Sequence, residues 1–167
     1  MGHGHPFVNL QNIFGRTVVD GLNLGLAESS DTQRKEYSLQ KGDVLFIRSS
    51  VKPEGVGEAA LVPYSLDNTT YSGFIIRFRP TLEMDDNFKQ IVFSTTNARN
   101  QIMASATSSA NTNINQESLQ KITIMLPCIK EQSKIGGFFT TLDHLITLHQ
   151  RMHRESGFMK FQEEKPC

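Results

Sequence analysis

A change of apolar periodicity after Pro127 constrains this chain more than any other feature of its sequence. From there on, apolar side chains and one histidine recur at steps of three, four, three, four and three residues, which is the spacing of a helix with a narrow apolar seam. The seam positions are Ile135, Phe138, Leu142, Leu145, His149 and Met152. A helix from Ile129 to Glu155 would be roughly 40 Å long, which is more than one small domain needs. We therefore expect the apolar seam residues to pack against another helix of the same kind.

The residues around this segment suit the two ends of a helix. Pro127 is typical of a helix start, and Glu131 would place a negative charge in the first turn, where the helix dipole favours it. Ser156-Gly157 is expected to end the helix. Because Gly136-Gly137 would cost about 1 kcal/mol per glycine inside a helix, we expect this pair to allow a close approach of a neighbouring backbone.

Upstream of this helix the pattern is that of short strands. The run from Val44 to Arg48 follows a turn signal at Lys41-Gly42-Asp43 and has the length and composition of a buried strand. Ala59 to Tyr64 is a second strand candidate, and Phe74 to Arg79 is a third, in which basic and apolar residues alternate between the two faces. Ile122 to Leu126 also alternates, and we expect a strand there that the following proline stops.

Two further segments complete the predicted architecture. Residues 86–94 have helical spacing of their apolar side chains, and this helix could continue through Met103. Residues 104–116 are mostly Ala, Ser, Thr and Asn, so we expect a loop. The sequence thus predicts an α+β fold, with a mixed twisted-sheet domain over residues 1–126 and a long coiled-coil-forming helix within residues 127–167.

Composition limits the class of protein. With 38% hydrophobic residues the chain can form a core, and no apolar run approaches the roughly 18 to 20 residues of a membrane span. The first residues lack the apolar stretch of a secretory signal, and Cys128 and Cys167 have no metal-site or disulfide-framework spacing. We expect a soluble, cytoplasmic protein. Because 17 basic and 17 acidic side chains cancel, net charge does not indicate nucleic acid as a partner.

The common motifs of catalysis are absent from the sequence: there is no P-loop, no dinucleotide fingerprint, no HExxH and no GxSxG. Three weaker alternatives remain. Gly55-Val56-Gly57 is a fragment of a phosphate-binding glycine motif, and His149 and His153 have the spacing of paired metal ligands on a helix. Cys128 could act as a hydrolase nucleophile, although His144 would lie about 24 Å away along one helix. We expect no enzyme activity, no cofactor and no metal.

A set of polar and basic residues at loops and strand ends suggests DNA reading instead. Arginine pairs with guanine acceptors, glutamine pairs with adenine, and serine and lysine hold phosphates. The candidate DNA-contacting residues are Arg48, Ser50, Lys52, Arg77, Arg79, Arg99 and Gln101. Because the same residue types occur on any soluble protein, the residues alone are also compatible with an ordinary solvated surface that binds no DNA.

The segment from Asn113 to Met152 carries a more specific signal. A short Ile-rich stretch and a proline are followed by the pairs Glu131-Gln132, Phe138-Phe139 and Leu142-Asp143 within an apolar helix. In this order it resembles the end of a recognition domain and the helical spacer of specificity subunits of type I restriction-modification systems. Upstream, YSLQKGDVLFIRSS is similar to the strand and loop of that family, GFIIRFRP to its next core strand, and the region from Arg99 to Ile102 to its recognition helix. The resemblance covers Phe7 to Met152.

This resemblance implies a non-catalytic subunit without a cofactor of its own. It implies a target recognition domain over residues 1–126 that reads one half of a bipartite double-stranded DNA target. Residues 127–167 would be a spacer for dimerisation and subunit docking. The partners implied are DNA methyltransferase subunits that modify adenine, a motor-nuclease subunit that cuts DNA, and a second copy or a second specificity half that pairs through the helix.

Two departures from the family pattern qualify this expectation. The chain begins close to the expected recognition domain, and residues 156–167 lack the long charged helix that is usual there. Both departures argue against a self-sufficient chain. The near-zero net charge fits a module whose affinity depends on assembly with basic partners, so we expect the isolated chain to bind DNA weakly and in a salt-sensitive way. The alternative function is a scaffold that binds the methyltransferase subunits through its helix without reading DNA.

Overall fold

A three-stranded antiparallel sheet lies at the centre of the computed structural model, which describes residues 3–108 and 111–163. Its middle strand is β3 (Val44–Ile47), with β5 (Ala59–Leu61) on one side and β7 (Ile75–Phe78) on the other. All of β3 is buried, because both faces of this sheet are covered. A strand covered on both faces is continuously apolar rather than alternating. This is why the apolar run from Val44 to Arg48 predicted a buried strand.

Two hydrophobic cores lie on opposite faces of this sheet, since successive residues of a strand point to opposite sides. Val44 and Phe46 belong to the core on the side of α2 (Asp86–Val92) and α3 (Thr96–Ser105). Leu45 and Ile47 belong to the core on the side of the N-terminal segment. Other buried members are Phe88, Val92, Phe93, Ile102 and Ile114 in the first core, and Val8, Ile13, Val19, Leu39 and Leu66 in the second.

A mixed sheet lies beyond the second core. Its middle strand β1 (His5–Val8) pairs antiparallel with β2 (Gly25–Ala27) and parallel with β6 (Thr70–Tyr71). The 3₁₀ helix η1 (Leu10–Asn12) and the helix α1 (Asp31–Glu36) belong to the same side. The predicted α+β fold with a mixed sheet is therefore confirmed.

A third sheet, which we call the polar ribbon, lies beside the central sheet. In it β9 (Thr112–Asn113) pairs with both β4 (Ser49–Ser50) and β8 (Thr107–Ser108). The 3₁₀ helix η2 (Pro53–Gly55) follows β4. The stretch predicted to be mostly loop thus contains two short strands. Its Ser, Thr and Asn residues show no apolar periodicity that would mark a strand. The strands depend on the tertiary pairing of β9 with β4, which the local sequence does not reveal.

The predicted helix over residues 86–103 is two helices. Between them the chain turns, Phe93 packs edge-on against Phe46 with ring centroids 4.9 Å apart, and the hydroxyl of Thr95 accepts a hydrogen bond from the Ala98 backbone N–H. Serine and threonine hydroxyls satisfy free N–H groups at a helix start, so Thr95 begins α3 as a separate element. A further short helix, α4 (Gln116–Gln120), follows β9.

The strand predicted from Ile122 to Leu126 is wrong. This segment has no regular secondary structure and pairs with no strand among the described residues. Instead the side chain of Gln101 bonds both backbone groups of Thr123: its Oε1 accepts from the N–H at 2.9 Å and its Nε2 donates to the carbonyl at 2.8 Å. A side-chain amide thus takes the place of a neighbouring strand, while Ile122 and Ile124 pack against the first core.

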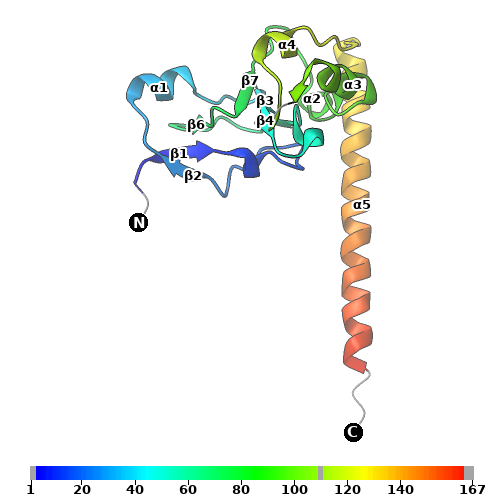
Figure 1. Ribbon diagram of the computed structural model, residues 1–167. Helices are drawn as coiled ribbons and strands as arrows, with labels where there is room; N and C mark the ends of the chain where they lie inside the picture. The colour runs from blue at the N-terminus through cyan, green and yellow to red at the C-terminus, as the bar shows by residue number, and fades with distance from the viewer. Residues whose placement is uncertain (1–2, 109–110, 164–167) are drawn as a thin grey trace.

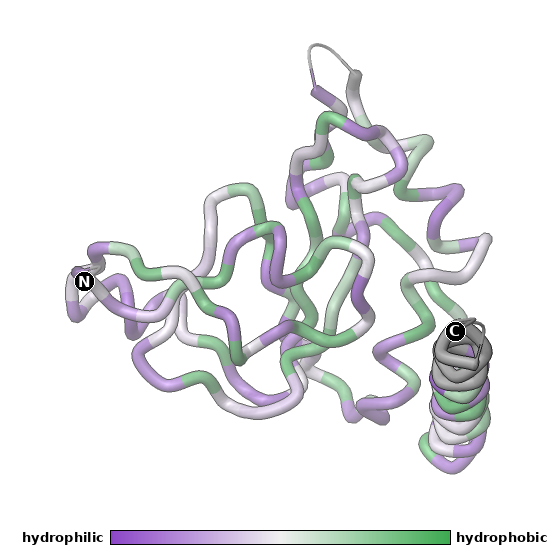
Figure 2. The backbone as a smooth tube through the Cα atoms, turned by 90° about the horizontal axis from the view of Figure 1, so that it is seen from below, coloured by the Kyte–Doolittle hydropathy of each residue, from purple (hydrophilic) through white to green (hydrophobic). Residues whose placement is uncertain are grey.

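The helix α5 (Ile129–Glu163) extends away from the rest of the chain (Figure 1). Its start agrees with the prediction, but the predicted end at Ser156-Gly157 is wrong, because one glycine costs about 1 kcal/mol without stopping a helix. With 35 residues, α5 is roughly 52 Å long. Figure 2 shows it standing beside the domain, with apolar and polar segments along it. Residues 164–167, including Cys167, lie outside the described residues. In the part that is described, no helix is long and apolar enough to cross a membrane.

Candidate nucleic-acid interface

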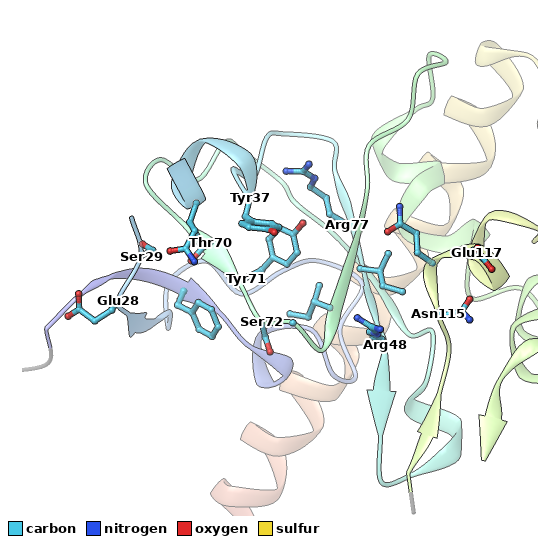
Figure 3. Close-up of a pocket in the computed structure, with 16 residues that line it drawn as sticks. Glu28, Ser29, Tyr37, Arg48, Thr70, Tyr71, Ser72, Arg77, Asn115 and Glu117 are labelled. Carbon is cyan, nitrogen blue, oxygen red and sulfur yellow. The ribbon is translucent and has the colours of Figure 1, made fainter. Parts of the chain in front are cut away.

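An open groove of about 820 Å³, which we call the polar groove, lies between the mixed sheet and the start of α4. Figure 3 shows the side chains that line it, which come from segments far apart in the sequence. Its polar and aromatic lining includes Glu28, Ser29, Tyr37, Arg48, Thr70, Tyr71, Ser72, Arg77, Asn115 and Glu117. The groove therefore offers guanidinium, amide, hydroxyl and aromatic groups in one place, which are the groups that bind bases and phosphates.

Arg77 stands on one wall of the groove in a fixed position. Its Nη1 donates to the carbonyl oxygens of Ser38 at 2.6 Å and Glu36 at 3.2 Å. Its guanidinium carbon lies 5.9 Å from the centre of the Tyr71 ring, and Tyr37 meets that ring edge-on. Burial raises the pKa of the Tyr71 hydroxyl above its ordinary value.

Arg48 lies toward the other side of the groove, and its backbone is held while its side chain is exposed. Its N–H donates to the Phe74 carbonyl at 2.8 Å and its own carbonyl accepts from the Ile114 N–H at 2.9 Å. Within residues 3–108 and 111–163, its guanidinium makes no ion pair and no hydrogen bond. Because β4 follows directly, Arg48 joins the polar groove to the polar ribbon and is available to a ligand at either.

Ser50 and Lys52 lie just beyond, where β4 leads into η2. The Ser50 hydroxyl accepts from the Lys52 backbone N–H at 3.1 Å, and the Lys52 side chain is exposed. Arg99 fastens the following turn, since its Nη1 donates to the Val56 carbonyl at 2.8 Å and its Nη2 to the Glu54 carbonyl at 2.6 Å. The position of the Lys52 loop therefore depends on Arg99.

The remaining two predicted residues bond to their own chain. Arg79 forms a two-fold hydrogen-bonded ion pair with the buried Asp43, and Gln101 holds Thr123. The structure thus brings Arg48 and Arg77 into one groove, whereas Ser50 and Lys52 follow Arg48 along the chain and are not part of the groove lining. It places Arg79, Arg99 and Gln101 where each already stabilises the fold. Contact with DNA stays a prediction for all seven residues.

Sequence reasoning missed several groove residues, among them Tyr37, Tyr71, Ser72, Asn115 and Glu117. They belong to segments that only the tertiary fold brings together, and no local spacing marks them. Glu28 and Glu117 add negative charge to the same groove that Arg48 and Arg77 line. A surface of mixed charge does not attract phosphates along its whole length, so we expect it to favour hydrogen bonding over a uniform electrostatic hold.

Three alternatives to DNA binding, a metal site, a cysteine nucleophile and a phosphate-binding glycine motif, can be compared with the structure. His149 and His153 have ring centroids 4.4 Å apart, but the described residues contain no group of three or more His, Cys, Asp or Glu that could hold a metal ion. Cys128 is exposed just before α5. Gly57 adopts a positive φ of 69°, and a Cβ there would stand 2.4 Å from the Ile102 side chain, which gives this glycine a packing reason. The predicted absence of enzyme activity, cofactor and metal stays a prediction.

The seam of α5 is exposed along most of its length. Phe138 is 61% and Met152 67% exposed, and Leu145 and Ile146 are each more than half exposed. Exposed apolar side chains at heptad spacing on a protruding helix are the arrangement that pairs with another helix. The α5 seam is therefore the second candidate interaction surface of the chain.

Comparison with known proteins is consistent with this geometry. Residues 16–155 match the family model described as type I restriction modification DNA specificity domain. The type I restriction enzyme EcoKI specificity subunit of Escherichia coli (strain K12) is 30% identical over 136 residues, which are 80% of this chain and 29% of that subunit. The chain thus spans less than a third of the length of this curated relative.

Solved structures show the same fold. The HsdS subunit from Thermoanaerobacter tengcongensis matches with a TM-score of 0.66 at 18% identity, over 91% of this chain and 39% of that one. The type I restriction-modification system S subunit from M. genitalium matches with a TM-score of 0.50 at 15% identity, over 99% of this chain and 40% of that one. Both likenesses confirm the α+β domain with its long helix.

Proposed function

Because the chain belongs to the type I restriction modification DNA specificity domain family, we propose that it reads one half of a bipartite double-stranded DNA target. In this role it directs adenine methylation and DNA cleavage that partner subunits carry out. The chain itself supplies recognition and no catalytic residue. The observation that carries the proposal is Arg48, which lies between the polar groove and the polar ribbon and whose exposed guanidinium has no partner among the described residues.

We assign a role to each residue according to whether its polar groups are exposed or already bonded to the chain itself. Arg48 and Lys52 have exposed cationic groups next to Ser50, so these residues bind base edges or phosphates directly. Arg77 presents its guanidinium at the groove wall while two carbonyls hold it in place, and such a fixed donor selects its acceptor by position. Arg79, Arg99 and Gln101 act on DNA through the segments that they hold.

We further propose that α5 pairs with an equivalent helix through Ile135, Phe138, Leu142, Leu145 and Met152. The equivalent helix comes from a second copy of this chain or from a second specificity half, so that two recognition domains reach two half-sites. Methyltransferase subunits and a motor-nuclease subunit complete the assembly. A cytoplasmic location stays a prediction, in keeping with partners that act on chromosomal DNA.

The direct test is a binding competition with the chain assembled on its methyltransferase subunits. Labelled DNA that carries a target sequence is competed with DNA in which one half-site is scrambled. We expect the assembled chain to prefer the intact target and to lose that preference when Arg48 is replaced by alanine. Equal binding of both DNAs, with methyltransferase binding retained, would support the scaffold function instead.

A further inference from the structure

The base of α5 is fixed to the domain by a small set of contacts with the start of α2. Gln132 is only 2% exposed, and its Oε1 accepts from the Asp85 backbone N–H at 3.0 Å while its Nε2 donates to the Pro127 carbonyl at 2.8 Å. The Ser133 hydroxyl donates to Asp85 Oδ2 at 2.8 Å. Asp85 is at the same time the N-cap of α2, since its Oδ1 accepts from the Phe88 N–H at 3.0 Å. One carboxylate thus ties together the beginnings of α2 and α5.

Gly136, one turn further along α5, lies directly against the same helix start. A Cβ at this position would stand 2.6 Å from the Phe88 backbone nitrogen, 2.7 Å from the Asn87 Cβ and 2.8 Å from the Asn87 carbonyl carbon. Two of these neighbours are backbone atoms, which a side-chain rotation cannot move away. At Gly137, by contrast, a Cβ would meet nothing within 4 Å. Only the first of the two adjacent glycines is required by packing.

These contacts use a different face of α5 from the apolar seam. Residues 132, 136 and 140 succeed one another by four along one side of the helix, whereas the seam runs through residues 135, 138, 142 and 145. One face of the helix therefore contacts its own domain, and the seam on another face is available to a partner. From Gly136 onward, the seam residues Phe138, Leu145 and Met152 are exposed.

We propose that Asp85, Gln132, Ser133 and Gly136 form an orientation clamp that fixes the direction of α5 relative to the polar groove. The consequence for recognition rests on the proposed function: two domains on paired helices meet DNA at a separation that the two clamps set. A tilt of about 10° at the clamp would move a residue fourteen positions further along α5 by roughly 4 Å. The clamp residues are thus positioning residues for the spacing of the two half-sites, without touching DNA.

The first test measures orientation in the full chain. Spin labels on Lys35→Cys and Gln150→Cys, in a background with Cys128→Ser and Cys167→Ser, report the distance between α1 and α5 by pulsed electron resonance. Labelled chain is diluted with excess unlabelled chain, so that only distances within one molecule are read. We expect Gly136→Ala to shift or broaden this distance distribution and Gly137→Ala to leave it unchanged. Superimposable distributions for all three chains would overturn the clamp.

A milder variant keeps the test decisive if Gly136→Ala does not fold. Ser133→Ala removes only the hydrogen bond to Asp85 and introduces no clash, so we expect a broader distribution at full folding. Lys134→Ala, on the same turn, removes a side chain that is exposed and is the matched control. A Ser133→Ala distribution as narrow as that of the control would count against the clamp.

The second test measures half-site spacing in the complex with methyltransferase subunits. A DNA library in which the two half-sites are separated by different numbers of base pairs is methylated and sequenced. We expect Gly136→Ala to reduce methylation at the native spacing by about tenfold or more relative to altered spacings, since small misplacements carry large rate costs, and Gly137→Ala to behave as the native chain. An unaltered spacing preference in a clamp variant whose distance has shifted would overturn the link to recognition. Failure of the native chain to direct any methylation would refute the proposed function, while the distance measurement would still decide the clamp.

Discussion

Arg79 donates hydrogen bonds of 2.7 Å from its Nε and its Nη2 to the two carboxylate oxygens of Asp43, whose side chain is 1% exposed. The same carboxylate accepts from the Gln40 backbone N–H at 2.8 Å. The hydrogen bond with Asp43 raises the pKa of Arg79 above its ordinary value. The pair ties β7 to the turn that precedes β3, so it stabilises the central sheet with or without DNA.

Replacing Arg79 by alanine is therefore expected to lower the free energy of unfolding. The loss should be about 1 to 3 kcal/mol, because a buried carboxylate is left without its partner, and the partial exposure of the guanidinium keeps the loss below that of a fully buried pair. Urea unfolding of the variant and the native chain measures it. Unchanged stability together with weaker DNA binding would make Arg79 a DNA contact, as its residue type suggested.

Arg48→Ala is expected to leave stability unchanged and to weaken DNA binding. Its side chain holds nothing in the described part of the fold, so stability should stay within about 0.5 kcal/mol of the native value. DNA affinity should fall, and the slope of log affinity against log salt should decrease by about one if Arg48 binds a phosphate. Salt titrations of the assembled chain measure this. The charge-matched control is Lys134→Ala on α5; the same loss in both variants would mean that Arg48 contributes only general charge.

Arg99→Ala is expected to weaken recognition by about 1 to 3 kcal/mol, through the loop that carries Lys52 rather than by direct contact. Without its two hydrogen bonds to Val56 and Glu54, the turn should open more often. Hydrogen exchange at the backbone amides of residues 55–57 should accelerate in parallel with the loss of affinity. Arg99→Lys should show much of the same effect, because an ammonium does not bridge two carbonyls as the guanidinium fork does. Unchanged site preference of Arg99→Ala in a competition assay would refute this role.

Leu142→Asp tests the seam of α5. A charge in the middle of an apolar helix interface costs several kcal/mol of pairing free energy, so the variant should stay monomeric at concentrations where the native chain pairs. Sedimentation of both chains, each with and without a second specificity half, measures the pairing. Thr147→Asp lies near the opposite side of the helix from Leu142 and is the control. Equal association of the two variants would exclude pairing through the seam.

The sequence predicted those parts of the fold whose residues carry their own signal. Val44–Ile47 is apolar throughout because two cores cover it, and the heptad steps after Pro127 foretold α5. The prediction failed where a tertiary contact overrides a local pattern. Ile122 to Leu126 alternates as a strand would, yet the side chain of Gln101 bonds Thr123 in place of a neighbouring strand.

Part of the candidate interface could be predicted from residue type, and part of it depends on the tertiary fold. Residue type singled out Arg48, Arg77 and Lys52, and the structure places the first two in the lining of one groove. Residue type could not show that Arg79 and Arg99 already bond to their own chain. It also could not find Tyr37 and Tyr71, because their segments meet only in the folded domain.

The measurement that tests the central claim most directly is a methylation map. DNA is sequenced for methyladenine from cells that express the cognate methyltransferase subunits with this chain and from cells that express them alone. We predict a new bipartite motif that appears only with the chain, with two identical inverted half-sites if two copies pair and two different half-sites if a second specificity half takes part. The absence of any new motif, with the chain recovered in complex with the methyltransferase subunits, would contradict the claim that it reads DNA.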